Sequence, residues 1–90
     1  MSFAQHTKAK NENPSCTIFV KEGDFYETYD KDAPVVAKIL NLTVTTRTRQ
    51  AEPPVKMCGF PYWQFTQNMT KLEASGITEI LVFHNEKPKK

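Results

Sequence analysis

The chain has 90 residues, of which 39% are hydrophobic, 24% charged and 11% aromatic, a composition that fits one globular domain and excludes a disordered chain. Its net charge of +2 is too small to indicate a nucleic-acid-binding protein by itself. The longest apolar stretch, residues 80–83, is far shorter than the roughly 20 residues of a membrane span. Because residues 1–13 also lack the apolar segment of a secretory signal, we expect a soluble, cytoplasmic domain.

The first half of the chain predicts an arm, two strands and a helix. Residues 1–15 are polar, and we expect a loose or disordered N-terminal arm there. Residues 17–29 are rich in β-branched and aromatic side chains, which predicts two strand segments broken by a bulge or bend at Gly23. A helix is predicted over roughly 32–41, because apolar residues recur there at helical spacing. Those residues are Ala33, Val36, Ala37 and Leu40.

The second half predicts a hairpin, a second helix and a last strand. Residues 42–49 and 55–60 have strand composition and are expected to pair as a hairpin. Pro61 is placed to open the helix and Gly76 to end it. The apolar stripe of that helix is predicted to be Tyr62, Phe65, Met69 and Leu72. Residues 77–84 are apolar enough to predict a central strand of the sheet.

The element order is therefore β-β-α-β-β-α-β. One mixed sheet with two helices is a small two-layer α/β (α+β) domain. We expect this domain to span residues 16–85, between the N-terminal arm and a charged tail at residues 86–90.

The sequence carries no recognisable catalytic or cofactor motif. It has no phosphate-binding glycine loop and no catalytic Ser or His motif. Cys16 and Cys58 are 42 residues apart, and no His/Cys/carboxylate group has metal-ligand spacing. Cys58 is expected to be a small buried residue, and Asp30 and Asp32 are interpreted as capping, solvated residues. We therefore expect neither an enzyme nor a bound metal or cofactor.

Two segments resemble one protein family. Residues 23–27 read Gly-Asp-Phe-Tyr-Glu and closely resemble the GDFYE signature in the N-terminal mismatch-recognition domain of the MutS family of DNA mismatch-repair proteins. Residues 54–62 are similar to that family's P-x-x-M-x-G-x-P-Y turn into its second helix. The similarity continues at residues 42–47 and 71–72, in the same order, over residues 16–84. It implies a mixed sheet flanked by helices.

The resemblance also implies a role for two residues of the signature. In that family, the Phe stacks on a mispaired or unpaired base from the minor groove and the Glu hydrogen-bonds it. The corresponding residues are Phe25 and Glu27, which strand alternation puts on one face, about 7 Å apart. Tyr26 points to the other face and is expected in the core. A Phe on a strand is more often buried than exposed, so burial of Phe25 remains the alternative.

Further DNA contacts are implied on the basic side of the domain. Arg47 matches a basic position that the family uses on the DNA backbone, and Arg49 and Lys56 are weaker candidates nearby. Trp63 lies off the helical stripe and is a candidate for contact with a sugar or phosphate. In the family, ATP binding belongs to other domains, so none is expected from these 90 residues.

Two functions therefore remain open from the sequence. The first is weak binding to mispaired or distorted duplex DNA through the Phe wedge and the Glu. The alternative is a protein-interaction or regulatory module of a larger DNA-processing or mobile-element protein. The local charge of −3 over residues 21–32 motivates the alternative, because an acidic edge fits a basic protein partner.

Overall fold

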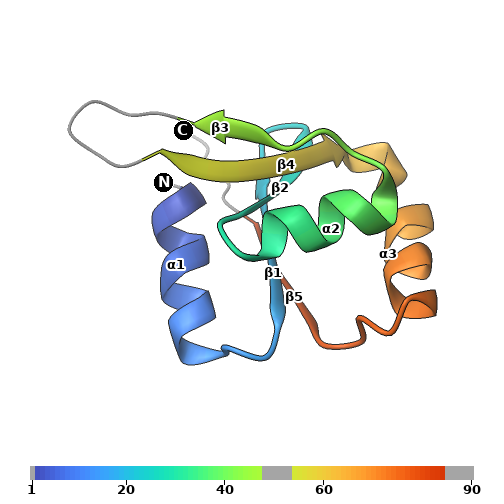
Figure 1. Ribbon diagram of the computed structural model, residues 1–90, viewed down its shortest axis with the longest axis horizontal. Helices are drawn as coiled ribbons and strands as arrows, with labels where there is room; N and C mark the ends of the chain where they lie inside the picture. The colour runs from blue at the N-terminus through green and yellow to red at the C-terminus, as the bar shows by residue number, and fades with distance from the viewer. Residues whose placement is uncertain (1, 48–53, 85–90) are drawn as a thin grey trace, which may run out of the picture.

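The computed structural model describes residues 2–47 and 54–84, which form a mixed five-stranded sheet with three α-helices (Figure 1). The strand order is β3-β4-β2-β1-β5; β1 and β5 are parallel and the other neighbours antiparallel. The elements are α1 (Ser2–Glu12), β1 (Thr17–Glu22), β2 (Phe25–Tyr29), α2 (Asp32–Leu40), β3 (Thr45–Arg47), β4 (Val55–Pro61), the 3₁₀ turn η1 (Tyr62–Gln64), α3 (Phe65–Ala74) and β5 (Ile80–His84). This confirms the predicted α+β class and the predicted order from β1 onward.

One face of the sheet packs against α2 and α3 and holds the apolar core. Alternate strand residues point into it, as expected for a half-buried sheet. The fully or nearly buried members are Phe19, Tyr26, Ala33, Val36, Ala37, Leu40, Cys58, Phe60 and Leu72. The predicted stripe of α2 and the predicted burial of Tyr26 and Cys58 are thus confirmed. Burial raises the pKa of the Cys58 thiol to about 11, so this thiol stays protonated and inert at neutral pH.

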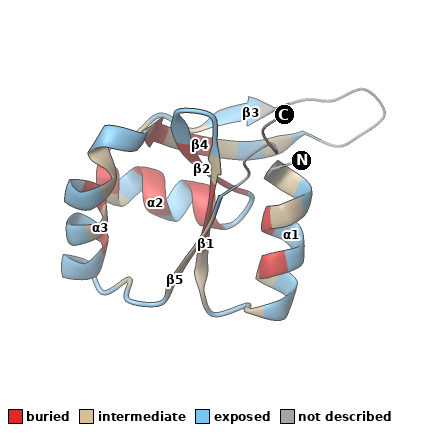
Figure 2. Cartoon of the chain, turned by 180° about the vertical axis from the view of Figure 1, so that it is seen from behind, coloured by how far each residue is buried: buried red, intermediate tan, exposed pale blue. Residues whose placement is uncertain are grey.

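The other face is covered by α1, which the sequence analysis did not predict. The expectation of a loose arm is wrong for residues 2–12, which form a helix packed beside β1 (Figures 1 and 2). His6 and Ala9 are buried in this contact. The arm looked loose because its composition is polar, and the polar groups find partners in residues distant along the chain.

The last strand is the second correction. β5 was expected at the centre of the sheet, but it lies at an edge and pairs only with β1 among the described strands. Its neighbour β1 is an interior strand, where Ile18, Phe19 and Val20 have no exposed surface because both faces are covered. In β5, residues 80–83 are only half-buried. The apolar run therefore predicted the strand correctly but not its position in the sheet.

The turns lie where the sequence predicted them, whereas some strand and helix ends differ from the prediction. Gly23 has a φ of +60° and joins β1 to β2 in a tight hairpin, and Gly76 has a φ of +95° just after α3, both as predicted. β3 and β4 form the predicted hairpin, although β3 begins only at Thr45. Pro61 is followed by η1 rather than directly by α3, so Tyr62 is half-exposed instead of joining the apolar stripe.

Candidate nucleic-acid interface

The pairing of β2 with β4 brings the two sequence motifs together. In this antiparallel register Phe25 lies opposite Pro61, and Glu27 lies opposite Gly59. Partners across an antiparallel pair share a face of the sheet, so Phe25, Glu27, Gly59 and Pro61 all face the side that carries α1. The spacing of each motif therefore has a structural reason, because each supplies alternate residues to one surface.

Phe25 is exposed at the start of β2, as the wedge hypothesis requires. Its side chain keeps 47% of its surface accessible, whereas the neighbouring Tyr26 is 8% exposed. The backbone N–H of Tyr62 donates a 2.8 Å hydrogen bond to the carbonyl oxygen of Asp24, which ties η1 to the β1–β2 turn. Two further exposed aromatic side chains, Tyr62 at 50% and Trp63 at 68%, therefore lie beside this turn. Trp63, which the sequence places off the helical stripe, is thus at the surface.

Glu27 lies over the close approach of β2 and β4. A Cβ atom at Gly59 would come within 2.8 Å of the Tyr26 carbonyl oxygen and 3.3 Å of the Glu27 Cγ. Only glycine leaves this space for the stem of Glu27. The hydroxyl of Tyr29 donates a hydrogen bond to the Glu27 Oε1, so the carboxylate is already oriented by its own strand. The glycine of the second motif and the i, i+2 spacing of Glu27 and Tyr29 are the sequence signals for this arrangement.

A lysine lies at the same end of the sheet as Phe25 but on the opposite face, because Lys21 pairs with Tyr26. The Nζ of Lys21 donates a 2.8 Å hydrogen bond to the carbonyl oxygen of Gly23 and lies 5.7 Å from the centroid of the Tyr62 ring. Such a cation–π contact places a positive charge beside the exposed aromatic side chains. The sequence analysis counted Lys21 only as part of an acidic segment, because the pairing with Tyr62 joins residues 41 positions apart.

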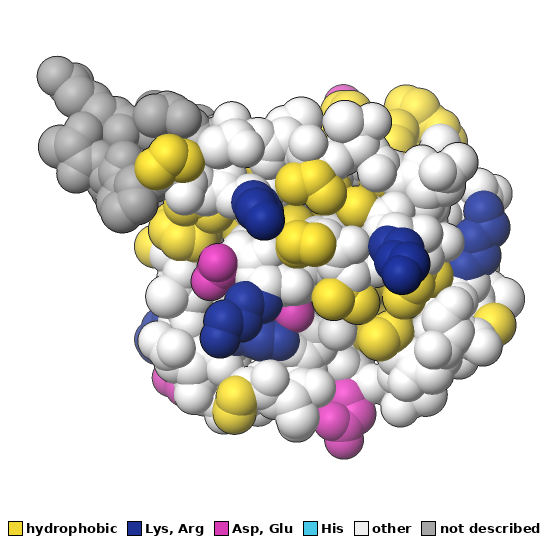
Figure 3. Space-filling model, in the orientation of Figure 1, with side chains coloured by type: hydrophobic (Ala, Val, Ile, Leu, Met, Phe, Trp, Pro, Cys, Tyr) yellow, Lys and Arg dark blue, Asp and Glu magenta, His cyan; other side chains and the backbone are white. Residues whose placement is uncertain are grey.

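Of the three predicted basic residues, the structure places one, Lys56, on a face of the sheet. Lys56 pairs with Thr46 and alternates with Cys58, so it lies on the α2 and α3 face, opposite Phe25 and Glu27. Arg47 is the last residue of β3, and Arg49 lies outside the described residues. On the face shown in Figure 3, the described Lys and Arg side chains stand in separate groups among apolar and uncharged ones. A continuous basic patch is not seen in that view.

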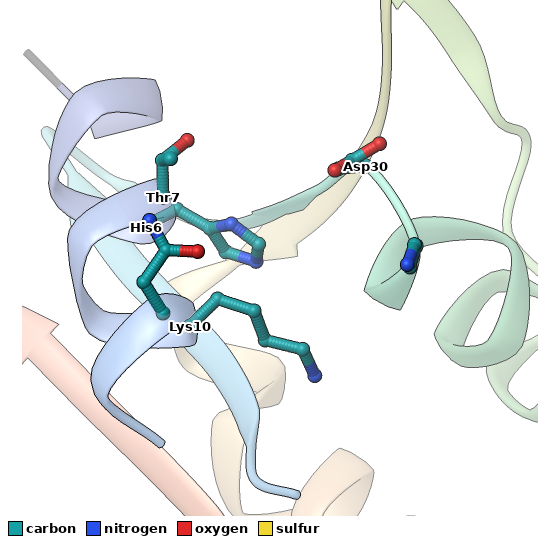
Figure 4. A pocket seen from close by; sticks show the side chains of 6 residues that line it. His6, Thr7, Lys10 and Asp30 are labelled. Atoms are coloured by element: carbon teal, nitrogen blue, oxygen red, sulfur yellow. The ribbon is translucent and has the colours of Figure 1, made fainter. Parts of the chain in front are cut away.

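A polar cluster of His6, Lys10, Thr28 and Asp32 joins α1 to the sheet. The Asp32 Oδ2 contacts the His6 Nε2 at 3.0 Å and accepts the backbone N–H of Ile18 at 3.1 Å, while its Oδ1 accepts the Lys10 ammonium at 2.7 Å. Thr28 donates to the Ile18 carbonyl oxygen at 2.7 Å. Figure 4 shows His6 and Lys10 extending from α1 beside a small pocket. Its lining is His6, Thr7, Lys10, Asn11, Asp30 and Lys31.

The interpretation of Asp32 as a solvated cap is wrong. Asp32 is 6% exposed and is the first residue of α2, and the N-cap residue is Lys31, whose side chain makes no capping bond. Burial alone would raise the pKa of Asp32, but the hydrogen bonds from His6, Lys10 and Ile18 outweigh it and lower that pKa. Asp32 therefore has a structural role that local helix-capping rules could not identify.

Metal clusters and membrane-spanning helices are both absent from the part of the chain that the structure describes. Within residues 2–47 and 54–84, no group of three His, Cys, Asp or Glu side chains could hold a metal ion. No helix in this part of the chain is long and apolar enough to cross a membrane.

These features define a small α+β domain that presents an exposed aromatic side chain and an oriented carboxylate from one strand. The chain belongs to the MutS family: the sequence model of MutS domain I matches residues 2–90. The family resemblance inferred from the two motifs is thereby confirmed.

Three curated relatives agree with this family assignment. The chain is 39% identical over 85 residues to the DNA mismatch repair protein MutS of Rhodopirellula baltica, 34% to that of Staphylococcus aureus and 33% to that of Staphylococcus saprophyticus. Each match covers 94% of this chain and 10% of the relative. The chain therefore spans about a tenth of the length of these curated relatives.

Proposed function

We propose that this domain binds duplex DNA at mispaired or distorted sites, with Phe25 as a wedge and Glu27 as the discriminating group. The observation that carries the proposal is the β2–β4 register, which sets an exposed Phe25 and an oriented Glu27 on one face. Membership of the MutS domain I family supports it, because the relatives named above are DNA mismatch repair proteins.

The exposure of Phe25 suits insertion between base pairs. An apolar side chain that enters a base step must unstack it, at a cost of a few kcal/mol that is smallest where pairing is already broken. Phe25 projects from the first residue of a strand whose next residue, Tyr26, is packed in the core. The backbone that carries the wedge is therefore rigid, so Phe25 loses little conformational entropy when it enters the duplex.

Glu27 supplies selectivity rather than affinity. A carboxylate near the phosphates of a duplex is repelled, and a hydrogen bond to a displaced base offsets that repulsion only when the base is available. Correctly paired DNA offers no such compensation. Glu27 is therefore proposed to weaken binding to matched duplex more than binding to mismatched duplex.

Phosphate contacts are proposed for residues around the wedge. Lys21 stands beside the Tyr62 ring next to the β1–β2 turn, and Trp63 is exposed in η1, which the Tyr62–Asp24 backbone hydrogen bond ties to that turn. Arg47 and Arg49 remain proposed contacts to the DNA backbone. With so few cations the affinity should be near the range for non-specific binding, a dissociation constant of about 10⁻⁴ to 10⁻⁶ M, and should fall with added salt.

The test is binding at low salt to two duplexes that differ only by one mismatch. We expect the wild-type chain to prefer the mismatched duplex, Phe25→Ala to lose that preference, and Glu27→Ala to bind matched duplex more tightly. Val35→Ala is a suitable control, because Val35 is also exposed, at 48%, but lies on α2.

Two results would contradict the proposal in different ways. Equal, salt-sensitive binding to both duplexes would indicate a basic surface without a wedge. An absence of binding at any salt concentration would favour the protein-interaction alternative.

A further inference from the structure

We infer that Tyr29 is a positioning residue that determines mismatch selectivity by holding the Glu27 carboxylate in one orientation. The inference rests on the proposed function, since it concerns how Glu27 discriminates between duplexes. It assigns a role to a fully buried side chain that does not itself reach the DNA-facing surface.

The first step is the hydrogen bond within β2. Tyr29 and Glu27 are two residues apart on one strand and therefore point to the same face. The Tyr29 hydroxyl donates to the Glu27 Oε1. One carboxylate oxygen is thus engaged by the protein, and the other, Oε2, is the atom that we assign to the displaced base.

The second step is the rigidity of Tyr29 itself. Its ring lies in edge-on contact with two rings of α1: the centroid of Phe3 is 5.7 Å away and that of His6 is 5.6 Å away. Such edge-to-face pairs are favourable and directional. A hydroxyl on a ring packed in this way has little freedom, so it acts as a fixed donor toward Glu27.

The third step is the space on the other side of Glu27. Gly59 lies opposite Glu27 in the β2–β4 register, and the close approach of the strands there leaves no room for a Cβ. The stem of Glu27 runs across this glycine and its end meets Tyr29. The side chain is therefore fixed at both ends, although it is only half-buried.

This arrangement predicts a loss of selectivity without a loss of the fold when the hydroxyl is removed. A flexible glutamate samples several rotamers and must be ordered when it meets a base, whereas a fixed carboxylate is ordered beforehand. Matched duplex offers no base to Glu27, so its binding should not depend on the hydroxyl. The signature of a positioning role is thus a change in the ratio of the two affinities.

The experiment compares Tyr29→Phe with Tyr26→Phe in the full chain. Both changes remove one hydroxyl from β2, but that of Tyr26 lies on the opposite face of the sheet, 3.5 Å from the His84 Nε2. We expect Tyr29→Phe to lower the ratio of mismatched to matched binding by about threefold to tenfold, the range for one hydrogen bond. Tyr26→Phe should leave the ratio unchanged, and both variants should unfold cooperatively near the wild-type temperature.

A double variant and a measurement without DNA complete the test. Adding Tyr29→Phe to Glu27→Ala should not change the ratio further, because the hydroxyl acts only through Glu27. In the free protein, NMR order parameters of the Glu27 side chain should fall in Tyr29→Phe.

The outcomes separate the inference from the function beneath it. If wild type prefers the mismatch and Phe25→Ala abolishes the preference while Tyr29→Phe keeps it, the positioning role is wrong and the wedge stands. Unchanged Glu27 order parameters in Tyr29→Phe would also overturn the positioning role. If wild type shows no preference at all, both proposals fall together.

Discussion

The two faces of the sheet both bury apolar side chains, but only the face that carries α1 adds a buried cluster of polar groups. The face that carries α2 and α3 is closed by apolar side chains such as Phe19, Phe60 and Leu72, all essentially without exposed surface. The face that carries α1 is closed by the buried apolar residues Ala9, Ile18, Val20 and Tyr29, and also by the contacts of Asp32 with His6 and Lys10. The second face is also the one on which Phe25 and Glu27 lie.

This difference shows how one small sheet separates stability from recognition. Apolar packing is non-directional and supplies most of the favourable free energy of folding. Hydrogen bonds are directional, so they can hold a polar side chain such as Glu27 in one orientation at the surface. Changes to the apolar face should therefore mainly affect stability, and changes to the α1 face should affect both stability and binding.

Phe60→Ala tests the apolar face and should have the largest effect on stability. Phe60 is 1% exposed and contacts the rings of Phe19 and Tyr26. Truncating a buried phenylalanine removes buried area and leaves a cavity, which should lower the free energy of unfolding by about 3–5 kcal/mol. Urea denaturation followed by circular dichroism measures this loss, and a change below 1 kcal/mol would contradict the described core.

Asp32→Asn tests the polar cluster. Removing the charge leaves Lys10 facing a neutral partner in a largely buried contact, so the free energy of unfolding should fall by about 3 kcal/mol. Because the folded-state pKa of Asp32 lies below the usual 3.8, its contribution is fully present above that pH. The contribution is lost as the pH falls through the lower, folded-state pKa.

The pH dependence of the free energy of unfolding is the control for Asp32→Asn. The stability difference between wild type and Asp32→Asn should be constant near neutral pH and should narrow below about pH 4. A difference that widened with acid would mean that Asp32 is not held in its charged form by the fold.

Gly59→Ala tests the close approach of β2 and β4. The new Cβ would lie 2.8 Å from the Tyr26 carbonyl oxygen, so the strands must separate locally, at a cost of about 1–3 kcal/mol. Because the same Cβ would press on the Glu27 stem at 3.3 Å, mismatch selectivity should fall as well. Gly23→Ala is a comparison, since a Cβ there meets nothing within 4 Å and only the positive φ is strained.

Phe25→Ala should have the smallest effect on stability. Phe25 has the same side chain as Phe60 but is 47% exposed. Its truncation should change the free energy of unfolding by no more than about 0.5 kcal/mol, as for other surface positions. Thermal unfolding of the two variants side by side measures the contrast, and a large loss in Phe25→Ala would mean that this residue belongs to the core.

Local patterns explain which parts of this molecule could be predicted from the sequence. The spacing of Ala33, Val36, Ala37 and Leu40 identified the buried side of α2, because helix periodicity needs no knowledge of a partner. Strand alternation likewise put Phe25 and Glu27 on one face and Tyr26 on the other. Glycines at Gly23 and Gly76 marked positive φ angles.

The parts that were missed depend on contacts between distant residues. The docking of α1 rests on Asp32, 26 residues from His6 and 22 from Lys10, and polar composition alone does not reveal such a partner. Neither does a hydrophobic run reveal whether a strand is central or at the edge, as β5 shows. In the candidate site, the role of Gly59 was missed because it arises only when β2 pairs with β4. The role of Tyr29 was missed although its i, i+2 spacing from Glu27 is a local signal.

The most direct test of the account is the mismatch preference of Phe25→Ala and Glu27→Ala beside wild type, at low salt. The account predicts that wild type prefers the mismatched duplex, that Phe25→Ala binds both duplexes equally, and that Glu27→Ala gains affinity for matched DNA. Equal binding of both duplexes by wild type, with no change in either variant, would contradict it.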